Sequence, residues 1–405
     1  SSRRRHTRYK VTGVQTCALP ISPHGLTVPD VLAICKEYEL VFLHTSTPSL
    51  ANDARCAEAI KAVYPEIQIG LIGAHVAVLP EQTLQAHDAI DFVCRHEFDY
   101  TCRQLAEGHP WHQIKGLSYR NQEGQIIHNP DRDLIHDWGS MPSVLPIYDR
   151  DLEIERYFIG YLLHPYISFY TGRGCPAKCS FCLWPQTIGG HQYRCKSPEV
   201  VGREMEQAKA IFGDRVREYM FDDDTFTIDK QRAIAISEHM KRLNLTWSCN
   251  ARANLDYETL KTLRDNGLRL LLVGFESGHQ QILDNINKGI RLDVARQFMK
   301  NCTKLGIKVH GTFILGLPVE TPETIDATIR FACEVNPHTI QVSIAAPYPG
   351  TALYNQAQAN GWFADGSLIT SSGYQTSSLH YPSLSSSQIE DSVERMYRRF
   401  YFRRR

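Results

Sequence analysis

The chain has 405 residues, more than one domain usually holds, so its length predicts two domains. Its 44 Lys and Arg residues balance 44 Asp and Glu residues, which leaves no overall field that would favour nucleic acid. No apolar run reaches the roughly 18 residues of a membrane-spanning helix, and twelve scattered cysteines favour a reducing compartment and predict a cytoplasmic protein.

Residues 1–22 differ in composition from everything that follows. They begin with the letters SSRRRH and show neither an apolar period nor the apolar segment of a targeting peptide. We interpret them as a non-native segment, because they resemble the translated adapter read-through found at the ends of metagenomic reading frames. On this interpretation the native N-terminus is missing.

Residues 23–136 alternate between strand and helix patterns. The periodicity predicts helices over 28–38, 51–64 and 80–86 and buried strands over 40–44, 67–72 and 90–94, followed by a hairpin over 113–128. Parallel strands with crossover helices imply an open doubly wound α/β sheet, whose ligands lie at the carboxyl ends of the strands. The residues at those ends are Thr45, Ser46, Thr47 and Gly73.

A proline-bearing stretch over 137–160 is predicted to be a linker to a second domain over 161–355. This domain begins with a strand over 166–170, and five further strand-then-helix units follow it. Each strand is almost continuously apolar, as parallel strands covered on both faces should be. Six such units predict a partial (β/α)6 TIM-like barrel, and polar or glycine-rich residues follow its strands, where barrel enzymes place their chemistry. Residues 356–405 form a C-terminal extension with one helix over 387–401.

Three cysteines, Cys175, Cys179 and Cys182, follow the first barrel strand at C-x3-C-x2-C spacing. Iron-sulfur clusters are held by cysteine thiolates, and a cubane normally takes four, so three thiolates would leave one iron open for chemistry. Two alternatives remain. The three thiols could belong to a structural zinc site, although no second Cys pair follows at suitable spacing, and Cys195 could close the cluster as a fourth ligand.

This motif resembles the signature of radical S-adenosylmethionine (SAM) enzymes, in which three cysteines bind a 4Fe-4S cluster and the open iron binds SAM. The resemblance implies reductive cleavage of SAM to methionine and a 5′-deoxyadenosyl radical that abstracts a hydrogen atom from the substrate, with a reductant such as flavodoxin or ferredoxin. It further implies that Asp223 or Asp224 binds the amino group of SAM, that Glu276 contacts its ribose or carboxylate, and that the segment from Gly311 to Gly316 packs against the adenine.

The first domain resembles the cobalamin-binding domain that precedes many radical SAM domains. The resemblance implies that Thr45, Ser46, Thr47 and Gly73 surround the nucleotide tail of cobalamin. The family commonly has two adjacent glycines where this chain has Gly73 and Ala74. On the interpretation of residues 1–22 as non-native, we expect the first strand and helix of the domain to be lost to that segment. His75 stands outside a D-x-H-x-x-G motif and is not expected to be the lower cobalt ligand. The alternative is that these are ordinary loop residues of a truncated sheet.

Four further segments resemble the radical SAM family of bacterial hopanoid biosynthesis: CLWPQTIGGH (182–191), FDDDTFT (221–227), WSCNARAN (247–254) and APYPGT (346–351). This resemblance implies ring contraction of a glycosylated bacteriohopanetetrol to its cyclitol ether. The substrate would then be a small molecule or a lipid-linked sugar, and peripheral contact with a membrane stays open.

The same resemblance gives the candidate sugar-binding residues, which are Trp184, Gln186, His191 and Arg252. Core packing remains the alternative for Trp184, and structural hydrogen bonding remains the alternative for His191 and Arg252. A cobalamin-dependent radical SAM methyltransferase is the second functional hypothesis. A non-catalytic module that binds cobalamin or an iron-sulfur cluster is the third.

Overall fold

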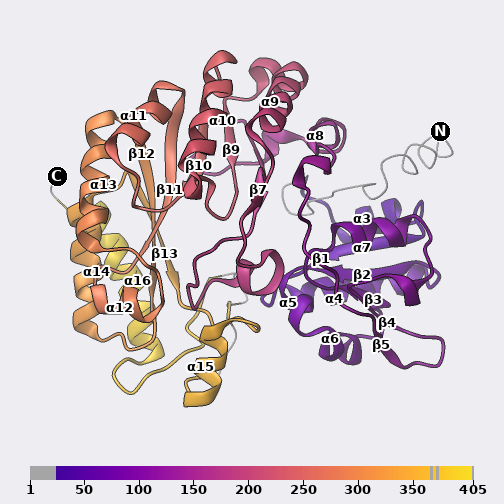
Figure 1. The fold of residues 1–405 in the computed structure, drawn as a ribbon. Helices are drawn as coiled ribbons and strands as arrows, with labels where there is room; N and C mark the ends of the chain where they lie inside the picture. Colours follow the sequence, from indigo (N-terminus) through magenta and orange to yellow (C-terminus); the bar gives the residue numbers. More distant parts are fainter. Residues whose placement is uncertain (1–23, 365–367, 371–373, 404–405) are drawn as a thin grey trace.

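The computed structural model describes residues 24–364, 368–370 and 374–403, in two α/β units joined by a short connecting segment (Figure 1). The segment 1–22, which we interpret as non-native, lies outside the described residues. In Figure 1 the first unit is indigo to purple, and the second runs from magenta to yellow. Among the helices of the described ranges, none is long and apolar enough to cross a bilayer.

The first unit contains a five-stranded sheet in the order β1-β2-β3-β4-β5. Strands β1, β2 and β3 are parallel, while β4 and β5 form the predicted hairpin and extend the same sheet in antiparallel pairing. Ile69 and Leu71 on β2 are fully buried and pack with Ile60 of α4 in one apolar cluster. The elements are α3 (Val28–Cys35), β1 (Leu40–His44), α4 (Leu50–Val63), β2 (Gln68–Ile72), α5 (Ala74–Val78), α6 (Pro80–Ala86), β3 (Phe92–Cys94), α7 (Asp99–Ala106), η1 (Trp111–Gln113), β4 (Leu117–Arg120) and β5 (Ile126–His128).

The predicted linker contains a helix and packs against the second unit. It holds η2 (Trp138–Ser140), α8 (Leu145–Asp151) and η3 (Ile154–Arg156). Leu145 and Ile154 are each only 2% exposed and belong to the core of the barrel. The burial of these apolar side chains therefore fixes the segment to the barrel. The proline content, from which we predict a linker, gives no sign of this packing.

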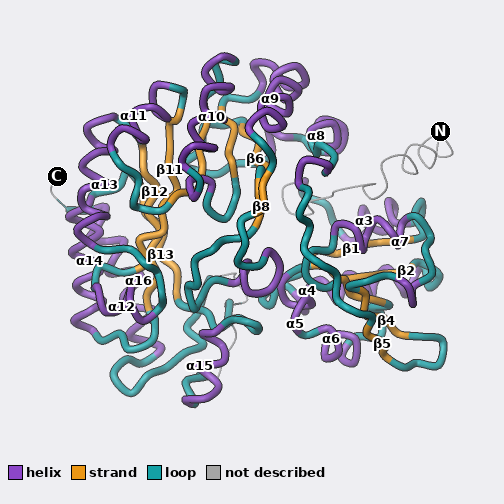
Figure 2. The backbone as a smooth tube through the Cα atoms, in the orientation of Figure 1, coloured by secondary structure: helices purple, strands orange, loops and turns teal. Residues whose placement is uncertain are grey.

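The second unit is an open, all-parallel six-stranded sheet in the order β13-β12-β11-β10-β9-β6. Helices cover the outer side of these strands (Figure 2). This arrangement confirms the predicted partial (β/α)6 barrel. The strands are β6 (Tyr166–Phe169), β9 (Glu218–Phe221), β10 (Trp247–Ala251), β11 (Leu268–Glu276), β12 (Lys308–Leu315) and β13 (Thr339–Ile344). The helices between and after them are α9 (Pro198–Phe212), η5 (Gly213–Arg215), η6 (Phe226–Ile228), α10 (Lys230–Arg242), α11 (Tyr257–Asp265), α12 (Gln280–Asn285), α13 (Leu292–Leu305), α14 (Pro322–Val335), α15 (Ala352–Asn360) and α16 (Ser386–Tyr401).

The two faces of the barrel strands have different environments, because successive side chains of a strand point to opposite faces. On the outer face, Phe221 and Trp247 are fully buried under the helices, with ring centroids 5.6 Å apart. On the inner face, Met220 and Leu270 pack with Leu162 from the connecting segment in a separate apolar cluster. This cluster lies toward the amino ends of the strands, and we call the inner side of the sheet the lumen.

The edge strand β13 is covered by side chains of the C-terminal extension. Its backbone N–H groups at Ile340, Val342 and Ile344 donate hydrogen bonds to Tyr401 Oη (3.0 Å), Tyr397 Oη (2.9 Å) and Gln375 Oε1 (2.9 Å). The two tyrosines are four residues apart and therefore lie on one face of α16. Helix α16 thus takes the place of a neighbouring strand along the open edge of the sheet.

We expect Tyr397→Phe to lower the free energy of unfolding by about 1 kcal/mol, because it removes the acceptor for the Val342 N–H. Urea denaturation followed by tryptophan fluorescence measures the change. Tyr374→Phe is the matched control, since Tyr374 is 74% exposed. Equal stability of Tyr397→Phe and the control would show that the edge hydrogen bond contributes nothing.

Candidate functional site

The loop that carries the three cysteines begins at the carboxyl end of β6 and returns as a hairpin. Its two ends pair as β7 (Gly172–Arg173) and β8 (Arg194–Cys195). A single π-helical turn, η4 (Pro185–Gly189), follows the third cysteine. We call residues 172–195 the cluster loop. It lies on the catalytic face of the barrel, as the sequence predicts.

The three cysteine thiols lie close enough to influence one another's ionisation. The pKa of Cys182 is raised to about 12, first by burial and then by the neighbouring thiol of Cys179, the carboxylate of Asp224 and the thiol of Cys175. Burial likewise raises the pKa of Cys175. Cys195, by contrast, has Arg232, Asp223 and Asp229 as its charged neighbours and lies at the base of the hairpin, opposite Gly172. The structure therefore groups the three predicted thiols and leaves Cys195 outside the group.

The three thiols are grouped on one loop. Across the described residues, no three His, Cys, Asp or Glu side chains converge on one point that would hold a single metal ion. In a cubane each thiolate binds a different iron, so the sulfur atoms need only be grouped. Three thiol donors on one partly buried loop fit a 4Fe-4S cluster.

Gln186 and His191 hold the backbone of the cluster loop. The Gln186 amide donates to the carbonyl oxygens of Cys182 (2.6 Å) and Cys179 (3.3 Å), and its Oε1 accepts from Ala352 N (2.9 Å). His191 Nδ1 lies 3.2 Å from Cys175 O. We predict sugar contacts for both side chains from the sequence. In the structure the Gln186 amide nitrogen and Nδ1 of His191 lie within hydrogen-bonding distance of backbone carbonyl oxygens of the loop.

Asp222, Asp223 and Asp224 have three different surroundings. Asp223 is fully buried and accepts hydrogen bonds from Thr171 N (2.6 Å), Thr171 Oγ1 (2.6 Å) and Tyr193 Oη (2.8 Å). Burial raises its pKa, while the bonds from Thr171 act in the opposite direction. Asp223 thus anchors the base of the cluster loop.

Asp224 is the acidic residue that reaches the thiols. Its Oδ2 accepts from Gly174 N (2.8 Å), immediately before the first cysteine. Because it is only partly buried, it can still offer an acceptor to an ammonium group. Of the two residues that the sequence proposes for the amino group of SAM, the geometry favours Asp224. Asp222 instead faces the lumen and accepts from Asn250 Nδ2 (3.0 Å).

Glu276 and Arg252 are linked through Lys288. Glu276 has a left-handed backbone (φ 62°) and accepts from Lys288 Nζ at 2.6 Å. Arg252 donates to the carbonyl oxygen of Lys288. Glu276 is only 5% exposed, so its carboxylate is committed to a buried ion pair at the rim of the barrel. The sequence proposes Glu276 for the ribose or carboxylate of SAM, and it does not reveal Lys288 as its partner.

The two predicted adenine-contacting glycines have different environments. A Cβ atom on Gly311 would lie 3.0 Å from Pro337 Cγ and 3.2 Å from Phe275, so this glycine faces the outer core. Gly316 has φ 81°, and its N–H donates to Glu320 Oε2 at 2.7 Å. Burial raises the pKa of Glu320 to about 8. The sequence analysis did not identify Glu320. The available signal was a glutamate four residues after a glycine, at the spacing of the turn in which Glu320 accepts the Gly316 N–H.

The residues predicted around cobalamin meet at the carboxyl edge of the first sheet. Thr45 N donates to Ile72 O (2.8 Å), and a Cβ atom on Gly73 would lie 2.2 Å from Thr45 O, so Gly73 permits this close approach. Thr47 Oγ1 lies 3.1 Å from His75 Nδ1. Ser46 Oγ bonds Ser49 Oγ at 3.0 Å near the start of α4. The edge is therefore built from small side chains and ordered turns.

This edge of the first unit contacts the cluster loop. Ala74 and Ala77 of α5 pack against Ile188 of η4, and His96 Nδ1 lies 3.0 Å from Thr187 O. Trp184 is 43% exposed, and its ring centroid lies 6.4 Å from that of His44 at the end of β1. Trp184 therefore stands between the two units rather than in a packed core.

A buried ion pair joins the two units at the base of the cluster loop. Glu97 and Arg194 are 1% and 3% exposed and form two hydrogen bonds of 2.7 and 2.9 Å. Arg173 adds a 2.8 Å contact to Asp99. The sequence analysis did not assign these residues, although charged residues directly after a predicted strand were the available signal.

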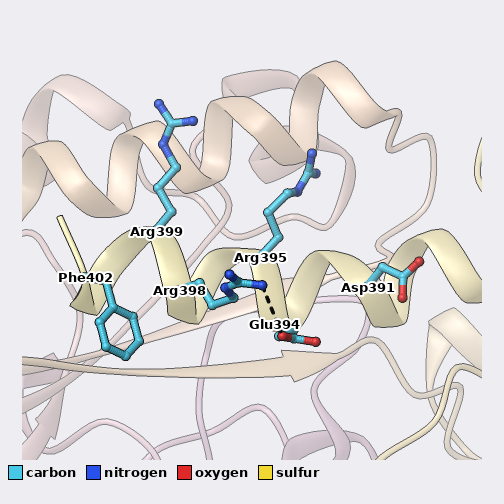
Figure 3. Close-up of a pocket in the computed structure, with 6 residues that line it drawn as sticks. All are labelled: Asp391, Glu394, Arg395, Arg398, Arg399 and Phe402. Carbon is cyan, nitrogen blue, oxygen red and sulfur yellow. Dashed lines mark ion pairs between the residues drawn. The ribbon is translucent and has the colours of Figure 1, made fainter.

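A separate surface hollow of about 790 Å³ lies along α16, on the outer side of the barrel (Figure 3). Acidic and basic side chains line it, and Arg398 pairs with Glu394 at 3.6 Å. It shares no residue with the cluster loop and does not belong to the site.

Comparisons with known proteins agree with this geometry. The family model of the radical SAM superfamily matches residues 169–332. The chain is 33% identical over 344 residues to a Pyrococcus horikoshii protein described as an uncharacterized methyltransferase, covering 83% of this chain and 73% of that protein. It is 31% identical over 205 residues to the bacteriochlorophyllide d C-8(2)-methyltransferase of Chlorobaculum tepidum, covering 48% of this chain and 45% of that protein.

Among solved structures, the chain resembles the radical SAM methyltransferase TsrM of Kitasatospora setae, determined with cobalamin and a [4Fe-4S] cluster bound. The TM-score is 0.69 at 16% identity, covering 91% of this chain and 81% of that one, which shows a common fold. The chain belongs to the radical SAM superfamily. It is accordingly an enzyme, whose cofactors are a 4Fe-4S cluster and SAM.

We expect Cys179→Ala to abolish the 4Fe-4S absorbance of the anaerobically reconstituted protein and all formation of 5′-deoxyadenosine with dithionite, because two thiolates cannot hold the cluster. Cys195→Ala is the matched control and should retain both signals. Loss of iron in Cys195→Ala, or cofactor cleavage by Cys179→Ala, would contradict the assignment of the three ligands.

We expect Glu97→Gln to destabilise the protein by about 3 kcal/mol, because Arg194 would be left as an unpaired buried charge. Glu153→Gln, which breaks the exposed pair with Arg156, should cost less than about 1 kcal/mol. Urea denaturation measures both values, and hydrogen exchange over residues 172–195 shows whether the cluster loop loosens. Similar losses in the two variants would mean that the buried pair has no special role.

Proposed function

We propose that this enzyme is a cobalamin-dependent radical SAM methyltransferase whose cluster is held by Cys175, Cys179 and Cys182. The contact between the carboxyl edge of the first sheet and the cluster loop carries the proposal. Ligands of open α/β sheets bind outside the carboxyl ends of the strands. A cofactor held at this edge, near Thr45, Thr47 and Gly73, would therefore stand beside the cluster loop.

The residues at the edge fit a large cofactor held without a histidine ligand from the loop after β2. The side chains of the two loops are small, and the ring of His75 is committed to Thr47. Trp184 and His44 offer ring surfaces between the edge and the cluster loop.

The cluster supplies an electron for reductive chemistry, and cobalamin supplies a carrier for the methyl group of SAM. The chain's own residues position these groups. Asp224 offers an acceptor beside the first cysteine, and the Glu276–Lys288 pair fixes the rim of the barrel. The apolar cluster of Met220, Leu270 and Leu162 keeps water out of the amino end of the lumen.

Methyl transfer is favoured over hopanoid ring contraction by the relatives of this chain, since both curated relatives named above are methyltransferases. Ring contraction rests on the resemblance of four short segments. Two of the four side chains proposed for its sugar site, Gln186 and His191, also form hydrogen bonds with the backbone of the cluster loop. Flavodoxin or ferredoxin is the proposed electron donor for either reaction.

The two reactions leave different products of SAM. We expect the anaerobic, reconstituted enzyme with hydroxocobalamin, dithionite and methyl-deuterated SAM to form S-adenosylhomocysteine and to place the label in the corrinoid fraction. Ring contraction would give only 5′-deoxyadenosine and unlabelled corrinoid. Mass spectrometry separates these outcomes, and a reaction without cobalamin is the control. 5′-Deoxyadenosine without S-adenosylhomocysteine would refute methyl transfer.

A further inference from the structure

The strand register defines a row of side chains across the inner face of the barrel. Phe169, Phe221 and Cys249 are partners on the outer face. The next residues are Tyr170 and Asp222, just past the ends of β6 and β9, and Asn250 on β10, and they come side by side on the lumen face. The pairing continues from β10 across β11 and β12 to β13. We call this set the lumen row; its members are Tyr170, Asp222, Asn250, Leu272, His310 and Thr339.

The lumen row contains a carboxylate with unused hydrogen-bonding capacity. Asp222 Oδ1 accepts from Asn250 Nδ2 at 3.0 Å, and Oδ2 has no partner among the described residues. Asp222 is partly buried, and burial together with the nearby carboxylates of Asp223 and Asp224 raises its pKa. A poorly solvated carboxylate with a free oxygen gains from a ligand that brings a positive charge or a donor.

His310, on the same row, gives a second and independent sign of a ligand. It is only 4% exposed, and its Nδ1 lies 2.7 Å from Thr339 Oγ1. Its Nε2 is buried and accepts or donates no hydrogen bond of normal geometry in the part of the chain that the structure describes, with the side chain of Gln341 on β13 as its polar neighbour. Buried polar atoms normally have partners, so an unpartnered nitrogen facing the lumen indicates that a ligand or water completes it.

Aromatic rings surround these polar groups. Tyr161 stacks on His310 with ring centroids 4.0 Å apart, and Tyr170 is 46% exposed at the open end of the lumen. Burial raises the pKa of Tyr170 to about 12, and Asp222 is the next largest cause, which places this phenol near the carboxylate. Tyrosine faces attract cations through the ring quadrupole.

The charges near the lumen row leave Asp222 without a cationic partner. No Lys or Arg belongs to the row, and burial lowers the pKa of His310, so its imidazole is neutral near pH 7. At the rim, Lys288 is paired with Glu276, and Arg252 donates to Lys288 O. Below the row, Arg269 is paired with Glu218 at 2.7 Å. An anionic ligand would meet only repulsion at Asp222.

We propose that the lumen binds the part of the substrate that carries a cationic nitrogen on an apolar or aromatic body, with Asp222 as its counter-ion. This proposal deepens the proposed function. It rests on that function in one respect, which is that the substrate binds in the lumen. It makes Asp222 a specificity-determining residue, distinct from Asp223, which anchors the cluster loop, and from Asp224, which reaches the thiols.

Two fragments that differ mainly in charge test the proposal directly. Phenethylamine and phenylacetate are titrated by ligand-observed NMR into the reconstituted full chain, with SAM bound and the cluster oxidised so that the cofactor site is filled and no turnover occurs. The variants are Asp222→Asn, which keeps an oxygen for Asn250, and Asp214→Asn as the exposed control. Cluster absorbance confirms that each variant is folded.

We expect phenethylamine to bind the wild type and Asp214→Asn equally, and to lose about tenfold in affinity with Asp222→Asn, the usual size of a charged hydrogen bond. Phenylacetate should bind the wild type and Asp214→Asn no more tightly than it binds Asp222→Asn. Equal phenethylamine affinity in all three proteins, tighter binding of phenylacetate to the wild type, or no binding of phenethylamine would each overturn the proposal. Because no methyl transfer is involved, this result is independent of whether S-adenosylhomocysteine forms.

Discussion

Two buried carboxylates, one from each unit, hold the cluster loop in place. Asp223, after β9, accepts two hydrogen bonds from Thr171, just before the loop, and one from Tyr193, near its end. Glu97, after β3, forms a double hydrogen bond with Arg194, also near the end of the loop. Both are almost completely removed from water, so each must keep its partners to avoid an uncompensated buried charge. The cysteine positions, the contact with the first sheet and the opening of the lumen all depend on this double attachment.

The attachment also couples the position of the first unit to the position of the cysteine thiols. The backbone between the first and third cysteines is bonded by Gln186 and His191, while η4 in the same loop packs on α5. A shift of the first unit would therefore be transmitted to the thiols through contiguous contacts. Burial raises the pKa of Cys175 and Cys182, so these thiols bind protons until metal replaces them, and cluster assembly must release those protons.

Much of the architecture could be predicted from the sequence, because apolar strands and amphipathic helices leave a periodic signal. The six barrel strands and the group of three cysteines are examples. The roles of individual polar residues could not be predicted in the same way. Gln186 and Gly311 look like site residues because they belong to motifs, yet one bonds the backbone of the cluster loop and the other faces the outer core. Ion pairs such as Glu97–Arg194 join residues 97 positions apart, and no local pattern encodes them.

A half-barrel, unlike a closed one, leaves a strand whose amides could template the pairing of another chain. On β13 three outward-facing amides donate hydrogen bonds to the side chains of Gln375, Tyr397 and Tyr401. These side chains do not form the regular row of backbone groups with which a further strand would pair. Helix α16 therefore protects this edge of the sheet from pairing with another chain. The same helix places Ile389, Met396 and Phe400 in the barrel core, so its removal would uncover apolar surface together with this edge.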